Sequence, residues 1–229
     1  IAQLYSKAIE GNYDMVICDY YEEFNRKTNY CCQNPNTTDT QSLLHKFLFQ
    51  QLHGSCCNKL VSRTCYNMPN VSFPQGVNIY EDLYVTCQML HNNISVGYLP
   101  KAFYHYRTSN TNSICNNITD RRIASKKDVI GVLSSELSIQ EEDLYVLKKS
   151  VLYDLLQTNH TDQLRRTYPE IHHRIRMDGF KWQFFAPLNN SLYLAMKGHA
   201  RMAYHFLQLN LKFIKWVQRL RKLIKMYVS

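Results

Sequence analysis

Hydrophobic and polar positions divide the chain into two parts of different character. In residues 1–117, short apolar runs typical of strands alternate with segments whose apolar positions follow a helical period. The run at residues 14–21 is rich in apolar and β-favouring residues, which predicts a buried strand in a sheet flanked by helices. Helical periodicity dominates residues 118–229. The pattern therefore predicts an α/β part followed by a mostly helical domain, with the boundary near Asn117.

Individual elements follow from the same pattern together with Gly, Pro and polar breaks. A polar stretch at residues 25–39 predicts a loop or an irregular hairpin, and Pro100 predicts a break between two short strands. The further predicted elements are helices at residues 1–10, 42–52, 81–92, 121–136, 141–157, 161–167 and 190–227 (interrupted near Gly198), strands at residues 95–99 and 102–106, a short helix or strand at residues 56–62, and a loop at residues 108–117.

Composition narrows the class of protein. Of the 229 residues, 45% are hydrophobic, which is enough for one large domain or two small ones with a real core. No apolar run approaches the roughly 18–20 residues that span a bilayer. The net charge of +9 is uneven, because residues 179–229 hold nine of the 27 basic residues and none of the acidic ones. The rest of the chain is neutral and carries no nucleic-acid-binding motif, so we expect no nucleic-acid partner.

The eight cysteines are even in number, as a set of disulfides would require. However, Cys31 is adjacent to Cys32 and Cys56 to Cys57, which suits a simple disulfide framework poorly. These pairs also lack the C-x2-C spacing of a common zinc site. We therefore expect reduced thiols in a cytoplasmic protein.

Two adjacent carboxylates, Glu81 and Asp82, follow a loop that contains Pro74 and Gly76, and they open an amphipathic helix. One interpretation is structural, because the dipole and free N–H groups of a helix N-terminus favour negative charge. The other is chemical, because the first turn of a helix can aim a carboxylate into a cleft as a general base toward a hydroxyl. The local pattern favours the structural interpretation, and the neighbouring segments bear on the chemical one.

Residues 206–228 combine an apolar helical stripe with crowded basic residues on the remaining surface. This pattern is typical of a helix lying in an anionic membrane interface, where we expect contacts from Lys212, Lys215, Trp216, Arg219 and Lys222. It also fits a basic helix for an acidic protein partner. A terminal helix that packs its stripe on the helical domain, with its lysines in water, is the third interpretation.

Four segments of the first half resemble, in order and spacing, parts of the inverting family 2 glycosyltransferases of the GT-A fold. They are YSKAIEGNYDMVICDYYEEF, SCCNKLVSR, FPQGVNIYEDLYVTCQML and VGYLPKAFYHYRTSNTNSI. They resemble, respectively, the helix and strand after the family's metal-binding motif, its S-x-W-N-K-L-Y-R segment, its F-P-x-G-x-x-Y-E-D-x-x-F helix and its closing V-x-Y-x-x-x-x-Y-x-Y-R…S-I segment. The resemblance covers about residues 1–115. It implies that residues 1–117 form the acceptor-side part of a nucleotide-sugar transferase domain.

The resemblance also implies roles for individual residues. Asp82 is then the general base that takes the proton of an acceptor hydroxyl, and Glu81 orients or contacts the acceptor. Arg107 suits the donor diphosphate, because its planar guanidinium pairs with phosphate oxygens; an ordinary surface arginine is the alternative. Asn58 and Lys59 line the acceptor or donor site, with capping and solvation as the alternative.

Three further site residues come from the same segments. Cys57 stands where the family usually has Trp, so it shapes the acceptor wall, and Tyr106 is expected to bind substrate. His105 stands where a Tyr is common. It is a candidate metal ligand, since His often binds metals, although aromatic packing is the commoner use of such a position.

The sequence departs from the family before the resemblance begins. Family members bind the nucleotide and a divalent cation (Mg²⁺ or Mn²⁺) with an N-terminal half that ends in Asp-x-Asp, and no Asp-x-Asp occurs in this chain. In the complete enzyme the cation holds the leaving diphosphate. We therefore expect either the C-terminal portion of a longer enzyme, inactive without its donor-binding half, or a protein that has lost that half naturally.

The resulting expectation is an enzyme of bacterial cell-surface polysaccharide biosynthesis. It would move a sugar from a nucleotide-sugar donor to a hydroxyl of a saccharide or lipid-linked acceptor, in the cytoplasm and peripherally at the inner face of the cell membrane. The alternative is a non-catalytic interaction or scaffold protein that retains a remnant of the fold and a basic helix for the membrane surface.

Overall fold

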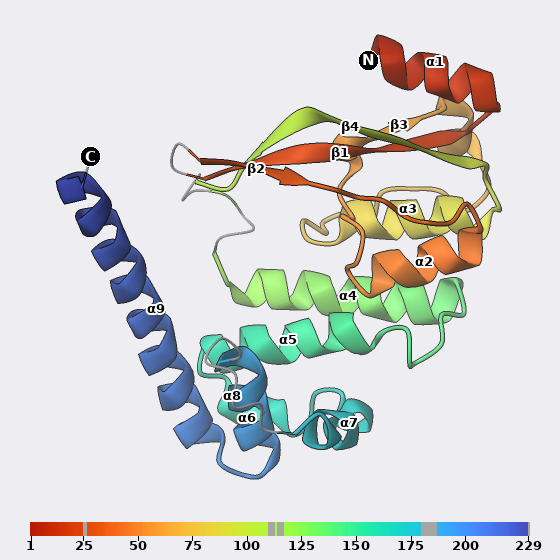
Figure 1. The fold of residues 1–229 in the computed structure, drawn as a ribbon. Helices are drawn as coiled ribbons and strands as arrows, with labels where there is room; N and C mark the ends of the chain where they lie inside the picture. Colours follow the sequence, from red (N-terminus) through yellow and green to blue (C-terminus); the bar gives the residue numbers. More distant parts are fainter. Residues whose placement is uncertain (25–26, 110–112, 114–116, 180–186, 229) are drawn as a thin grey trace. The chain divides into compact units, whose positions relative to one another are not determined.

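The structure is a computed structural model that describes residues 1–24, 27–109, 113, 117–179 and 187–228 (Figure 1). The chain divides into two compact units, Ile1–Leu147 and Lys148–Ser229. This division lies after the boundary predicted near Asn117, because helix α4 (Asp120–Glu136) belongs to the first unit. The identity of the predicted domains stays a prediction.

The first unit is built on an open, mixed, four-stranded sheet, so the expected α/β class is correct at this level. Its central strand, β1 (Met15–Phe24), pairs in parallel with β4 (Val96–Arg107) along nearly its whole length. The other edge of β1 is shared by two antiparallel strands. One is β3 (Lys59–Val61), at the start of β1, and the other is β2 (Lys27–Cys31), at its end. Strands β1 and β2 form a hairpin, and β2 lies within residues 25–39, the segment predicted as a loop or irregular hairpin.

Strand β4 corrects one prediction. The pattern predicts two strands around Pro100, whereas the structure has a single strand with a shift of register at this point. Leu99 pairs with Cys18 and Ala102 pairs with Asp19, so the residues between them bulge out of the ladder. Proline has no N–H to donate, and a bulge is where a strand tolerates it.

Helices cover both faces of the sheet (Figure 1). On one face, α1 (Ala2–Gly11) packs Leu4 against Val16 and Cys18 of β1. Because side chains alternate along a strand, Met15 and Ile17 point to the opposite face, where α2 (Thr40–Leu48) and α3 (Glu81–His91) lie. Each fully buried side chain of this kind contributes roughly 1.5–3 kcal/mol.

Short elements connect these layers. The segment predicted as helix or strand contains both, since a 3₁₀ helix, η1 (Cys56–Asn58), runs directly into β3. A second 3₁₀ helix, η2 (Arg63–Asn67), follows β3. The predicted helices at residues 42–52 and 81–92 correspond to α2 and α3.

The second unit is helical, as predicted. Helix α5 (Tyr145–Gln157) begins at the end of the first unit, and it starts after a turn rather than at the predicted residue 141. The predicted helix at residues 161–167 is one turn, α6 (Thr161–Leu164). The pattern missed α7 (His172–Met177), which the 3₁₀ helix η4 (Pro169–Ile171) precedes.

The long C-terminal helical segment breaks where the sequence indicates. Helix α8 (Pro187–Met196) and helix α9 (Ala200–Val228) meet at a turn in which Gly198 has a φ of +99°, a conformation that L side chains rarely adopt. The side chains at the centre of this unit are fully or almost fully buried, and they include Leu152, Leu155, Leu192, Ala203 and Leu207.

Candidate functional site

The acidic pair lies in the first turn of α3, where a helix favours negative charge, and the Glu81 carboxylate accepts from its own backbone N–H. The capping position is Tyr80, whose side chain makes no capping hydrogen bond. Asp82 Oδ2 instead accepts a hydrogen bond of 2.9 Å from the backbone N–H of Cys56, at the start of η1. Asp82 therefore ties two segments of the chain together, which the local sequence pattern does not reveal.

Tyr80 holds a strained backbone conformation directly before the acidic pair. Its φ of +70° lies in the left-handed region, which a bulky residue adopts at a cost of about 1–3 kcal/mol. Two contacts hold it there: Gln50 Nε2 donates to the Tyr80 hydroxyl at 3.0 Å, and Lys126 Nζ lies 5.5 Å from the centre of the ring. Strain of this kind tends to persist where a site must be positioned accurately.

A cavity of about 520 Å³ opens beside these residues. This volume is within the range of small-molecule sites in proteins, about 300–1,000 Å³. Its apolar lining comes from α2 and the residues after it and from the start of α3 and the segment before it, namely Phe47, Leu52, Ile79 and Leu83. Its polar and aromatic lining comes from four segments of the first unit and includes His53, Glu81, Asp82, Tyr106, Arg122 and Lys126.

The two carboxylates differ in their surroundings. Burial, and then the neighbouring Asp82, raises the pKa of Glu81 above its ordinary value. The Asp82 carboxylate also accepts from the Cys56 thiol, and its Oδ1 is hydrogen-bonded to no N–H or O–H donor within the described part of the chain. Since every buried side-chain oxygen and nitrogen there has a partner, this oxygen must be accessible from the cavity. It is placed to accept a proton or hydrogen bond from a ligand.

His53 is a cavity residue that the sequence analysis missed. Burial, and then the nearby Lys59, lowers its pKa to about 4, so the ring is neutral at physiological pH. Its Nδ1 accepts a hydrogen bond of 3.1 Å from the N–H of Ser55, which leaves the ring proton on Nε2. The ring packs edge-on against Tyr20 and Tyr106. A lone histidine in a loop carries no periodic signal, so only its tertiary position reveals it.

Asn58 and Lys59 are predicted to line the site. They are not among the residues that line the cavity. Asn58 is fully buried, and its Nδ2 donates to the Cys18 carbonyl at 2.9 Å. Lys59 Nζ donates to the carbonyls of His53 and Ser55 at 2.7 and 2.6 Å, and to Asn58 Oδ1 at 3.1 Å. Burial lowers the pKa of Lys59 to about 8. These contacts hold the segment between α2 and β3 in place.

The cysteines near this segment are not activated thiols. Burial, and then Asp82, raises the pKa of Cys56 to about 12, and burial raises the pKa of Cys57 as well. A thiol must lose its proton to act as a nucleophile, so neither residue suits that role at neutral pH. All seven cysteines in the described ranges are free thiols.

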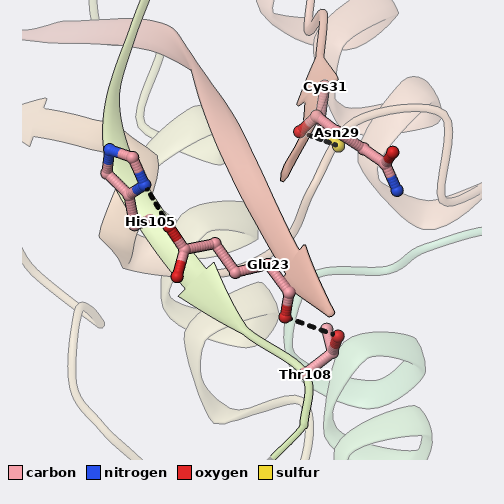
Figure 2. A network of polar contacts seen from close by, with 5 residues as sticks. All are labelled: Glu23, Asn29, Cys31, His105 and Thr108. Carbon is pink, nitrogen blue, oxygen red and sulfur yellow. Dashed lines mark hydrogen bonds and ion pairs between the residues drawn. The ribbon is translucent and has the colours of Figure 1, made fainter. Parts of the chain in front are cut away.

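The predicted site residues at the end of β4 differ in whether they line the cavity. Tyr106 lines it, as predicted for a substrate-binding residue, whereas the exposed Arg107 does not. His105 also points elsewhere: its Nδ1 lies 2.7 Å from Glu23 Oε1 of the neighbouring strand (Figure 2). Thr108 donates to the Glu23 carbonyl at 3.0 Å, which closes the end of this strand pair.

A metal site does not emerge around His105. In the parts of the chain that the structure describes, no three His, Cys, Asp or Glu side chains gather as a metal would require. The pair of His105 and Glu23 offers two donors on an exposed strand surface. The expected divalent cation therefore lacks a fitting donor set among these residues and stays a prediction.

Helix α9 exposes both charge and apolar surface. Leu209, Phe213 and Trp216 have exposed fractions of 67%, 46% and 55%, and Lys212 is exposed beside them. The side chains of the other predicted membrane residues, Lys215, Arg219 and Lys222, lie outside the described part of the chain. No helix among the described residues is both long and apolar enough to cross a membrane.

Comparison with known proteins gives no assignment: no protein-family model matches this chain, and no curated protein is significantly similar to it.

Proposed function

We propose that the protein is an inverting glycosyltransferase that moves a sugar from a nucleotide-sugar donor to a hydroxyl of a saccharide or lipid-linked acceptor. The observation that carries the proposal is the accessible Oδ1 of Asp82 at the wall of a cavity of about 520 Å³. Its second oxygen is fixed by the Cys56 N–H, so the carboxylate is oriented while one oxygen remains available. The resemblance of four sequence segments to family 2 of the GT-A fold supports the same reaction.

The proposed step is a single displacement at the anomeric carbon of the donor sugar. The acceptor hydroxyl oxygen forms the new bond as the bond between the anomeric carbon and the diphosphate oxygen breaks. The nucleoside diphosphate leaves with the electron pair of that bond, and the hydroxyl proton passes to Asp82. A positioned base of this kind contributes about 10²–10⁴-fold to the rate.

The rest of the cavity supports an acceptor role for this site. Sugars present apolar ring faces beside hydroxyl groups, and the cavity pairs apolar residues with polar ones in the same way. The neutral His53 adds an Nε2–H donor, which can bind an acceptor oxygen without introducing a charge. Glu81 lies next to the proposed base and is a second acceptor for hydroxyl groups.

The donor side of the reaction lies beyond this cavity. The described residues offer no fitting donor set for a divalent cation, and no step above is routed through one. Arg107 remains our proposed contact for the donor diphosphate, on the exposed end of β4.

Asp82→Asn tests the proposal, with Asp128→Asn on the exposed face of α4 as the matched control. Nucleoside diphosphate release is measured for the protein expressed from its complete coding sequence, with a panel of sugar nucleotides and acceptors. We expect the rate to fall by about 10²–10⁴-fold in Asp82→Asn and to be unchanged in the control. Full activity in Asp82→Asn would overturn the assignment of the base. The absence of transfer with every donor would favour the non-catalytic scaffold instead.

We also propose that α9 contacts an anionic membrane surface, which would place the enzyme peripherally at the inner face of the cell membrane. The exposed Leu209, Phe213 and Trp216 supply apolar contact, and Lys212 supplies positive charge at the same surface. Flotation with vesicles of anionic lipid tests this. Trp216→Ala should weaken binding, whereas Tyr5→Ala, which removes another exposed aromatic residue, should not. Equal binding to neutral and anionic vesicles would contradict the proposal.

A further inference from the structure

Helix α4 supplies two positive side chains to the cavity that contains Asp82. Arg122 and Lys126 both line it, and they are four residues apart on a 17-residue helix, so they lie on the same face. Neither residue belongs to a segment that resembles the transferase family. Their presence makes one wall of the cavity basic, opposite in charge to the start of α3.

This arrangement is unfavourable for the stability of α4 by itself. Two like charges four residues apart destabilise a helix by about 0.2–0.5 kcal/mol. Arg122 lies in the first turn, where Thr119 caps its N–H at 3.2 Å and where the helix dipole disfavours positive charge. Lys126 is 3% exposed at this wall, where its ammonium group also lies 5.5 Å from the centre of the Tyr80 ring. An anion bound at this wall would reduce the repulsion between the two like charges.

The acidic wall does not neutralise the basic one. Neither Glu81 nor Asp82 forms an ion pair with a Lys or Arg in the described part of the chain. The two signs of charge therefore stay apart within one cavity, on α3 and on α4. A ligand that matches both walls carries a hydroxyl group at one end and a negative charge at the other.

We propose that the cavity binds an acceptor saccharide that carries an anionic group, with Arg122 and Lys126 holding this group while a hydroxyl of the same molecule faces Asp82. The proposal rests on the proposed transferase function, and it adds the class of acceptor. A uronate carboxylate and a sugar phosphate share the chemistry required, because a guanidinium pairs with either through two parallel hydrogen bonds.

Binding to the 229-residue chain tests the proposal without any need for a donor sugar. Calorimetric titrations use four probes: methyl glucoside, methyl glucuronide, glucose 6-phosphate and inorganic phosphate. We expect at least one anionic sugar to bind about tenfold or more tightly than methyl glucoside, as charge-assisted hydrogen bonds predict. The preferred anionic sugar then distinguishes a uronate site from a phosphate site. Equal affinity for the neutral and anionic sugars, or inorganic phosphate binding as tightly as the sugars, would overturn the proposal.

Variants locate the anion. Arg122→Gln and Lys126→Gln should each reduce the affinity for the preferred anionic sugar about tenfold, whereas affinity for methyl glucoside stays the same. The neighbouring Arg121→Gln and Lys127→Gln are the matched controls, because these residues lie on the same helix and do not line the cavity. Circular dichroism verifies folding, and Arg122, which is less buried than Lys126, provides the test if Lys126→Gln unfolds. Unchanged affinity in Arg122→Gln would contradict the assignment.

The two proposals can fail separately. Asp82→Asn should abolish transfer but preserve the preference for the anionic sugar, since Asp82 lies on the other wall. A protein that keeps this preference and transfers no sugar would overturn the transferase function. A transferase whose activity toward neutral and anionic acceptors is equal, in the native chain and in Arg122→Gln, would overturn the anionic acceptor alone.

Discussion

Two aspartates of the first unit show how the interior of the sheet differs from the wall of the cavity. Asp19 in β1 is 1% exposed, and three donors saturate its carboxylate. Oδ1 accepts from the N–H of Gln33 at 2.6 Å and from the Tyr98 hydroxyl at 2.8 Å, and Oδ2 accepts from the Tyr30 hydroxyl. The Asp82 carboxylate accepts from the backbone N–H and the thiol of Cys56 and keeps an oxygen accessible.

The lysines of the same two regions repeat this contrast. Lys59 donates three hydrogen bonds to protein oxygens in the segment between α2 and β3, whereas Lys126 lines the cavity. A polar group whose hydrogen bonds are all made beneath the surface serves the fold, and a charged group at a cavity wall is placed to meet a ligand. Residue type alone does not separate the two cases.

The largest effect on folding should come from Asp19→Asn. The substitution removes the charge that strengthens three hydrogen bonds and places an N–H₂ group among their donors, so the free energy of unfolding should fall by about 1.5–3 kcal/mol. Asp82→Asn should change it by less than about 1 kcal/mol, because an amide oxygen can still accept from the Cys56 N–H. Urea unfolding followed by circular dichroism measures the free energy of unfolding of both variants. Equal losses would contradict the proposed difference between the two aspartates.

Lys59→Met should follow in size. Without the ammonium group, three acceptors lose their donor, and we expect a loss of about 1–3 kcal/mol in the free energy of unfolding. The same change at the exposed Lys27 of β2 is the control and should have little effect. If Lys59→Met leaves the free energy of unfolding unchanged, the buried ammonium group does not hold the segment between α2 and β3.

His53 predicts a dependence of stability on pH. Its pKa is about 4 in the folded chain and about 6.5 in the unfolded chain, so between these values the unfolded state binds more protons. Stability should therefore be complete above about pH 6.5 and fall as the pH approaches 4. Urea titrations across this range should show a weaker dependence in His53→Asn, which keeps an acceptor near Nδ1. The exposed His91→Asn is the control, and it should leave the dependence unchanged.

The smallest effect is expected for His105→Ala. The pair of His105 and Glu23 is exposed, and exposed ion pairs contribute about 0–1 kcal/mol. Thermal unfolding with and without added Mn²⁺ measures the effect and also tests the predicted metal ligand. A stabilisation by Mn²⁺ that disappears in His105→Ala would support the metal role, whereas identical shifts in both proteins would contradict it.

Local sequence predicted much of the fold and less of the site. The apolar run in β1 and the Pro-Gly loop before α3 act over short distances, so the pattern located both elements. Pro100 led to a wrong prediction of two strands, because a single strand can accommodate proline at a bulge. Helix α7 was missed because six residues contain too little periodicity. His53 lies in a loop and Arg122 and Lys126 lie on α4, and only the tertiary fold brings these residues to the cavity beside Asp82.

The pairing of β1 with β4 has a consequence for the order in which the protein folds. The hairpin of β1 and β2 is local and can close within microseconds, but β1 meets β4 across a long separation, for example between Met15 and Val96. On the ribosome, one edge of β1 therefore lacks its partner strand until synthesis has passed residue 107. During that interval the nascent chain presents an open β edge, which is the surface that chaperones and aggregating neighbours recognise.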